Sequence, residues 1–198
     1  MENNLSEITP DSEKKESPKK RSAAMGFFID TIETILLALV LFIGINAISS
    51  RVHVQNISMK PTLQPGDMLL INKLAYKLGQ PHHGDIIVFH FQGNIEEDYI
   101  KRLIGLPGDD VKVQNGIVTV NGFELNEPYI AATPNYQGEW IVPEGQFFVL
   151  GDNRNLSSDS HEWGFVEITD VVGKAIFAYW PFDRIKTFSQ PDLVLAAQ

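Results

Sequence analysis

An apolar stretch of about 23 residues, "GFFIDTIETILLALVLFIGINAI" at residues 26–48, places the strongest constraint on what this chain can fold into. A helix that crosses a bilayer needs about 20 mainly apolar residues, so the stretch is long enough to span one. Asp30 and Glu33 interrupt its beginning and are expected at the level of the lipid headgroups or against a partner. The sequence therefore predicts one transmembrane helix over residues 26–48, with membrane lipid as a partner.

Two other interpretations of residues 26–48 stay open. A basic region followed by an apolar core is also typical of a cleaved signal peptide, and a buried core helix can have a similar composition. The tail ahead of the stretch is long and polar, and the candidate active-site residue Ser58 follows only ten residues after Ile48. Both observations favour an uncleaved signal anchor.

The charges beside the stretch predict its orientation. Basic residues cluster before it, whereas Arg51 is the only one that follows closely. Because positive charge is retained on the cytoplasmic side, the N-terminus is expected in the cytoplasm and the chain after Ser49 on the opposite side. Residues 1–25 are rich in Glu, Ser, Lys and Pro and are expected to form a disordered tail. The basic cluster comprises Lys14, Lys15, Lys19, Lys20 and Arg21.

Residues 49–198 have the pattern of a mainly β domain. "RVHVQ" alternates apolar and polar side chains, and "DMLLINKLAY" and "GDIIVFHF" are apolar runs bounded by Pro and Gly. Asn115-Gly116 lies between two apolar-rich segments and predicts a tight β-hairpin. No long amphipathic helix is expected after residue 50. The sequence therefore predicts an antiparallel β-sandwich or barrel-like domain behind one N-terminal transmembrane helix.

Composition excludes several classes of site. The chain has no cysteine, which excludes disulfides, zinc-thiolate sites and a cysteine nucleophile. The net charge is −9 and the pI is near 5.0, and this acidic balance disfavours a nucleic-acid partner.

Ser58 is a candidate nucleophile because it follows a short strand and precedes a turn stiffened by two prolines, in "VQNISMKPTLQPGD" at residues 54–67. A serine hydroxyl is a poor nucleophile until a base removes its proton. His161 with Asp159 could complete a Ser-His-Asp triad. Lys101 is the stronger candidate, since apolar neighbours in a strand would lower its pKa by desolvation.

Each of these motifs also has a purely structural interpretation. Lys101 and Arg102 could form a solvated basic pair at the end of a strand. The polar segment "VLGDNRNLSSDSHEWG" at residues 149–164 could be a hydrogen-bonded turn network or the wall of a site.

Together the three segments resemble type I signal (leader) peptidases, the Ser-Lys membrane proteases. "SMKPTL" is similar to the family's Ser-Met-x-Pro-Thr-Leu box, and "DYIKRLIGLPGD" to its Lys-Arg-x-x-Gly-x-Pro-Gly-Asp box. "GDNRNLSSDSHEWG" is similar to the Gly-Asp-Asn box, although His161 stands where the family usually has Arg. The resemblance covers about residues 51–181, and the histidine is typical of cyanobacterial or plastid members.

The resemblance implies a role for each matching residue. Ser58 would be the nucleophile and Lys101 its general base. Ser157 would orient the lysine amine, and Asp159 would support the surrounding loop. The backbone N–H of Ser58 would stabilise the oxyanion, with the amide of Asn56 as a second donor.

The resemblance also implies the substrate and its place. Signal peptides of secretory preproteins would be cut after an Ala-x-Ala pattern, without a metal or other cofactor. The β domain would lie in the periplasm, another extracytoplasmic space or the thylakoid lumen. Small side chains would fit shallow apolar pockets lined by Val52, Val54, Leu63, Tyr99 and Ile100.

Two competing functions remain. Self-cleaving repressors are Ser-Lys proteases with a similar β core, but they are soluble and carry DNA-binding domains, so the acidic charge and the predicted span argue against them. A membrane-anchored β domain that binds extended peptides without cutting them is the alternative from another class. It would tolerate loss of Ser58 or Lys101.

Overall fold

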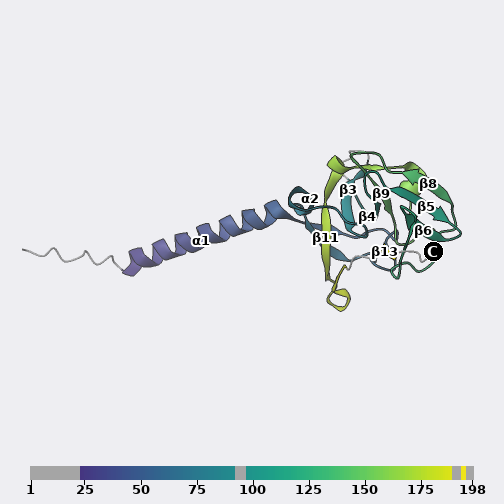
Figure 1. The fold of residues 1–198 in the computed structure, drawn as a ribbon. Coiled ribbons are helices and arrows are strands. Elements are labelled where there is room, and N and C mark those ends of the chain that lie inside the picture. Colours follow the sequence, from purple (N-terminus) through teal and green to yellow (C-terminus); the bar gives the residue numbers. More distant parts are fainter. Residues whose placement is uncertain (1–22, 92–96, 189–192, 195–198) are drawn as a thin grey trace, which may run out of the picture. The chain divides into compact units, whose positions relative to one another are not determined.

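The computed structural model describes residues 23–91, 97–188 and 193–194 (Figure 1). Most of the predicted tail, residues 1–22, therefore lies outside the described residues. Contacts divide the chain into two compact units, residues 1–42 and 43–198.

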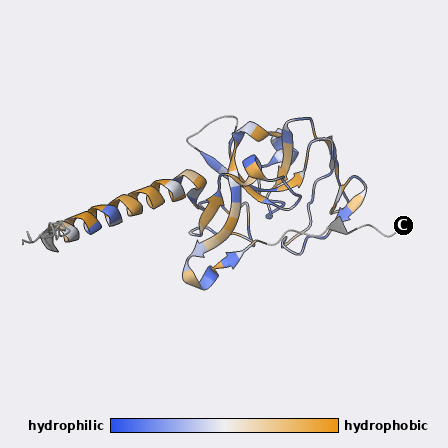
Figure 2. Cartoon of the chain, turned by 60° about the vertical axis from the view of Figure 1, so that its left-hand side comes forward, coloured by the Kyte–Doolittle hydropathy of each residue, from blue (hydrophilic) through white to orange (hydrophobic). Residues whose placement is uncertain are grey.

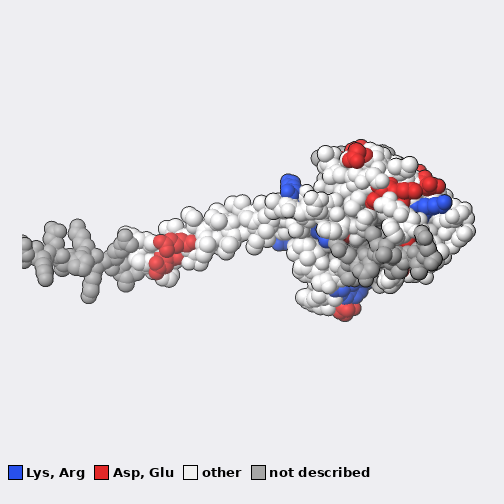
Figure 3. Space-filling view, in the orientation of Figure 1, with Lys and Arg blue, Asp and Glu red and all other residues white. Residues whose placement is uncertain are grey.

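Helix α1 (Ala23–Ile48) is the predicted apolar helix. It begins three residues before the predicted start at Gly26, because Ala23, Ala24 and Met25 all favour helix. Residues Met25–Ile48 are long and apolar enough to cross a membrane, and apolar residues occupy most of α1 (Figure 2). Acidic side chains gather near its N-terminal end (Figure 3).

The rest of the described chain forms two antiparallel sheets. The eight-stranded sheet has the order β1-β2-β11-β3-β4-β9-β10, with β12 paired to β11. Its strands are β1 (Ser49–His53), β2 (Met68–Asn72), β3 (Ile86–His90), β4 (Asp98–Gly105), β9 (Gln146–Leu150), β10 (Val166–Glu167), β11 (Val171–Trp180) and β12 (Lys186–Thr187). This arrangement confirms the prediction of a mainly antiparallel β fold behind one N-terminal apolar helix.

The five-stranded sheet has the order β13-β7-β6-β5-β8. Two consecutive Asn-Gly turns build it, since Asn115-Gly116 and Asn121-Gly122 all have positive φ, between 53° and 82°. Positive φ at both central residues is the geometry of a type I′ hairpin turn, which suits the twist of paired strands. The strands are β5 (Asp110–Gln114), β6 (Ile117–Val120), β7 (Phe123–Leu125), β8 (Gly138–Ile141) and β13 (Leu193–Val194).

Buried apolar side chains from the strands and the loops between them form the core of the domain. Val52, Val54 and Met59 pack with strands β2, β3 and β11 in one cluster, and Ile104 joins the core of the smaller sheet. Every helix described after residue 50 is a single short turn, as expected from the lack of helical periodicity. These are α2 (Ala75–Leu78), α3 (Ser160–Trp163), η2 (Ile168–Asp170) and η3 (Phe182–Arg184).

Candidate active site

Ser58 lies in a turn that begins where β1 ends. The backbone continues its pairing beyond the strand, since the Val54 N–H donates to the Asp67 carbonyl at 2.8 Å. Met59, directly after the serine, is buried, and its carbonyl accepts the Leu63 N–H at 2.8 Å. Buried Val54 before the turn and buried Met59 after the serine therefore fix the turn, and Ser58 itself is partly exposed.

Lys101 lies on the central part of the larger sheet, in strand β4, opposite Ile87 of β3. Its side chain is only 4% exposed. Burial lowers the pKa of the Lys101 amine to about 8, against the opposing effects of the nearby Asp159 and Asp152 carboxylates. A substantial fraction of the amine is therefore neutral in mildly alkaline solution, as a general base requires.

Ser58 and Lys101 line the same cleft, which has a volume of about 620 Å³. Leu63, in contrast, is fully buried and absent from the cleft lining, and it packs in one core cluster with the lining residues Val52 and Val54. Five other predicted residues line the cleft: Val52, Val54, Asn56, Tyr99 and Ile100. Sequence reasoning assigned no role to the other lining residues, although Met59, Asp98, Leu156 and Ser158 lie within the quoted motifs. These residues are Arg51, His53, Gln55, Ile57, Met59, Glu97, Asp98, Leu156 and Ser158.

The loop after β9 holds the backbone of the candidate nucleophile. The Asn153 N–H donates to the Ser58 carbonyl at 2.9 Å, and the Asn153 side-chain amide donates to the Ile57 carbonyl at 3.2 Å. Ser157 is buried beside Gly151, where a Cβ atom would lie 2.1 Å from its Oγ and 2.5 Å from the Ser58 carbonyl oxygen. Ser157 and the Ser58 backbone thus meet at Gly151.

Asp159 is fully buried and holds this loop through a hydrogen bond to its backbone. One carboxylate oxygen accepts the Gly151 N–H at 2.8 Å, and the other contacts His161 Nδ1 at 2.7 Å. His161 stacks on Tyr136 with ring centroids 3.9 Å apart, and it lines a second cavity of about 300 Å³ together with Ser157. The Asp-His pair of the alternative triad therefore exists, but His161 and Ser58 line different cavities.

Residues 28–180 match the family described as "Signal peptidase, peptidase S26". This chain belongs to that family. It is 43% identical over 181 residues to the probable signal peptidase I-2 of Synechocystis sp., covering 88% of this chain and 81% of the relative. It is 39% identical over 192 residues to signal peptidase I of Leptolyngbya laminosa, covering 92% and 93%. These matches confirm the resemblance to signal peptidases, including cyanobacterial members.

A crystal structure of a signal peptidase I from Enterococcus faecalis is 35% identical to this chain and has a TM-score of 0.44. The match covers 48% of this chain and 96% of that one. Membership of the signal peptidase family, together with the apolar helix α1, identifies a single-pass membrane protein.

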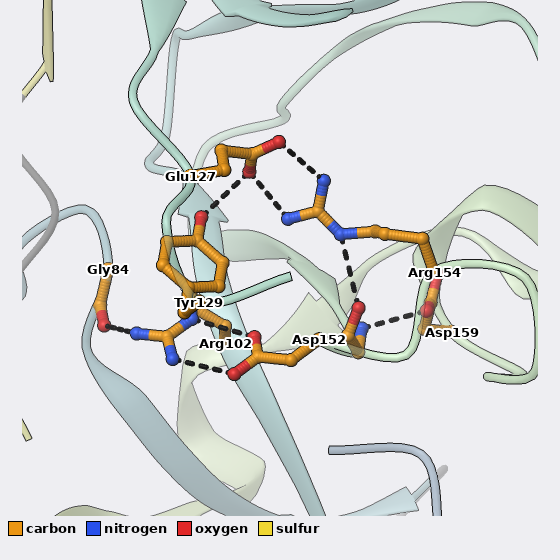
Figure 4. Close-up of polar contacts among 8 residues, drawn as sticks. Gly84, Arg102, Glu127, Tyr129, Asp152, Arg154 and Asp159 are labelled. Atoms are coloured by element: carbon orange, nitrogen blue, oxygen red, sulfur yellow. Dashed lines mark hydrogen bonds and ion pairs between the residues drawn. The ribbon is translucent and has the colours of Figure 1, made fainter. Parts of the chain in front are cut away.

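Buried ion pairs hold the residue that follows Lys101 and the loop after β9 in this signal peptidase (Figure 4). Arg102, next to Lys101, donates from Nε and Nη2 to the two oxygens of Asp152, each at 2.7 Å. Its Nη1 also donates to the Gly84 carbonyl at 2.8 Å. Arg102 is therefore buried and paired, not solvated, which short-range sequence patterns could not reveal because Asp152 lies 50 residues away.

Substitution of Gly151 by Ala is expected to lower kcat for signal-peptide cleavage by at least about tenfold. The added Cβ would overlap the Ser58 carbonyl oxygen and the Ser157 side chain, and small misplacements of catalytic groups are costly. Steady-state kinetics on a preprotein substrate would measure this. The matched control is Gly44→Ala in α1, where φ is not positive and no atom lies within 4 Å of the added Cβ; equal activity in the two variants would contradict the expectation.

Proposed function

We propose that this chain is a membrane-anchored serine endopeptidase that removes signal peptides from translocated preproteins after an Ala-x-Ala-type site. The observation that carries the proposal is that Ser58 and a buried Lys101 with a lowered pKa line one cleft in a member of the signal peptidase family. Neutral Lys101 accepts the Ser58 hydroxyl proton while the serine oxygen attacks the scissile carbonyl.

The tetrahedral intermediate carries its negative charge on the former carbonyl oxygen. The backbone N–H of Ser58 and the side-chain amide of Asn56, both at the cleft, stabilise this oxyanion. When the intermediate collapses, protonated Lys101 gives its proton to the leaving amine and an acyl ester remains on Ser58. Water then attacks the ester and Lys101 takes the water's proton. Lys101 returns this proton to the Ser58 oxygen as the ester bond breaks, which releases the peptide acid and restores Ser58 and the neutral amine.

Ser157 and Asp159 act indirectly in this scheme. In the proposed reaction Ser157 orients the Lys101 amine, and its buried Oγ is available for this because it makes no hydrogen bond to any described residue. Asp159 holds the loop through the Gly151 N–H and keeps a negative charge close enough to influence Lys101.

Specificity follows from the walls of the cleft. Val52 and Val54 approach it from the β1 side, and Tyr99 and Ile100 from β4. Their apolar surfaces favour small side chains such as Ala, and buried Leu63 packs in the same core cluster as Val52 and Val54. Strand β1 ends the order of the larger sheet, so an extended signal peptide can pair with its edge by β-augmentation.

The membrane arrangement completes the proposal. The N-terminal tail, residues 1–25, lies in the cytoplasm, residues 26–48 cross the membrane, and the catalytic domain, residues 49–198, lies on the opposite side. The basic cluster before the helix supports this orientation. A protease held there meets cleavage sites as they emerge from the membrane, in the periplasm or the thylakoid lumen.

The test is cleavage of a purified secretory preprotein with an Ala-x-Ala site by the full chain in detergent. Wild type is expected to cut at that site, whereas a folded Ser58→Ala variant is expected to be inactive. A substrate with Phe in place of the Ala before the cut should resist both. Binding of the preprotein without cleavage by wild type would instead support the non-catalytic β domain.

The rate should rise with pH over the range in which Lys101 loses its proton. Only the neutral amine can act as the base, so kcat/KM should increase about tenfold per pH unit below about pH 8 and level off above it. A pH profile of kcat/KM for preprotein cleavage measures this. A rise in kcat/KM centred near pH 6.5, the ordinary histidine pKa, would instead point to a histidine base.

A further inference from the structure

We propose that Glu127 and Tyr129 are positioning residues for the Ser58–Lys101 dyad. They belong to residues 126–130, a segment between β7 and β8 that we call the strap. The strap comes from the smaller sheet, whereas Lys101 and the loop that holds Ser58 belong to the larger one. The inference rests on the proposed function, because it assigns the strap a role in that reaction.

Glu127 connects the strap to the loop after β9. Its two carboxylate oxygens accept from Nη1 and Nη2 of Arg154 at 2.7 Å and 2.5 Å. Arg154 is completely buried and Glu127 is 7% exposed, so solvent screens this pair little. A bidentate pair of this kind fixes orientation as well as distance. The loop residue Arg154 is therefore held at an angle that the strap sets.

Arg154 passes this constraint to the Ser58 backbone. Its Nε donates to the Gly151 carbonyl at 3.1 Å, in the same loop whose Asn153 N–H donates to the Ser58 carbonyl. Ser157 also packs against Gly151. A shift of Arg154 would therefore move the hydrogen bond that holds the serine.

Tyr129 connects the strap to the lysine strand. Arg102 directly follows Lys101 in β4. Its guanidinium carbon lies 3.8 Å from the centre of the Tyr129 ring (Figure 4). A guanidinium over an aromatic face is a favourable contact, strengthened by burial. Arg102 is thus held by the ring, by Asp152 and by the Gly84 carbonyl.

The Tyr129 hydroxyl links the Glu127–Arg154 pair to the Tyr129–Arg102 contact. It donates to the Glu127 carboxylate at 2.7 Å. Burial, followed by the charge of Glu127, raises the pKa of Tyr129 well above its ordinary value, so the hydroxyl remains a neutral donor at any working pH. One short segment therefore contacts both arginines, Arg102 next to Lys101 and Arg154 in the loop that holds Ser58.

The experiment compares four full-length variants with wild type in detergent. Tyr129→Phe removes only the hydroxyl, and Tyr129→Leu also removes the aromatic face. Glu127→Gln tests the carboxylate, and the double variant Glu127→Gln with Arg154→Gln removes both charges so that neither is left buried alone. We expect kcat for preprotein cleavage to fall about 10- to 100-fold in Tyr129→Leu and in the double variant. KM should stay within about twofold, because no strap residue lines the cleft.

Amide hydrogen exchange gives a second readout that does not depend on turnover. Faster exchange is expected at residues 151–157 in these variants, with β2 and β11 unchanged. Tyr179→Phe and Glu139→Gln are the matched controls, since these residues lie on β11 and β8 and outside the network of Figure 4. Both controls should behave as wild type in every measurement.

The outcomes separate the two proposals. If folded Tyr129→Leu and the folded double variant keep kcat within twofold of wild type, the strap inference is overturned while the proposed function stands. A rise in KM with unchanged kcat would also overturn it, since that would indicate substrate binding. Absence of cleavage by wild type would instead overturn the proposed function.

Discussion

Lys101→Met is expected to reduce kcat for signal-peptide cleavage by about 10³- to 10⁴-fold, the upper range for removal of a general base. Methionine has a similar length and no ionisable group, so it fits the buried position without keeping the base. Thermal unfolding of the variant should occur at or above the wild-type temperature, because a buried amine is replaced by an apolar group. Loss of activity without loss of stability would then assign the effect to chemistry.

Lys101→Arg separates the charge of Lys101 from its basicity. Arginine keeps a positive charge but cannot be deprotonated in a protein, so this variant should be as inactive as Lys101→Met. The control is Lys112→Met, on the exposed side of β5, where the side chain is 44% exposed; it should retain full activity. Cleavage at more than about a tenth of the wild-type rate by either Lys101 variant would rule out the lysine base.

Asp152→Asn is expected to lower the free energy of unfolding of the domain more than the substitution of a surface carboxylate would. It leaves the buried Arg102 guanidinium without its carboxylate, and breaking a buried ion pair from one side typically costs about 3–5 kcal/mol. For a chain of this size the unfolding temperature should fall by about 6–20 °C. Thermal unfolding of the full chain in detergent, followed by circular dichroism, measures the shift.

The exposed Asp183 provides the matched control for Asp152. Asp183→Asn should leave the unfolding temperature unchanged within about 2 °C, as expected for a surface substitution. Replacing both partners, in Arg102→Met with Asp152→Leu, should recover much of the lost stability, because neither charge is then buried alone. Equal unfolding temperatures for Asp152→Asn and wild type would show that the pair contributes nothing net.

Local patterns in the sequence were enough to predict several parts of the fold. The apolar run ending at Ile48 and the Asn115-Gly116 turn depend on neighbours along the chain, and both formed as expected. The helix start differed by three residues, because favourable helix formers extend α1 beyond the apolar run. The second turn, Asn121-Gly122, uses the same geometry and completes the smaller sheet.

Several features of the candidate site could not be predicted from local sequence patterns. Leu63 shares a motif with Ser58 and was expected beside the substrate, yet the turn directs it into the core. Glu127 and Tyr129 lie in a segment with no periodic pattern or catalytic motif, and nothing in the sequence pairs them with residues 25 or more positions away. Hydrogen bonds across such separations are decided only when the sheets assemble.

By itself, the sequence determined the chemical identity of the candidate dyad, the anchor and the β character of the domain. These follow from residue type and short-range spacing, which act before the chain is compact. Only the tertiary structure decided that Lys101 is buried enough for its pKa to fall and that Asn153 holds the Ser58 backbone. Desolvation and long-range hydrogen bonds depend on which distant segments exclude water from the same place, and that is a property of the packed sheets.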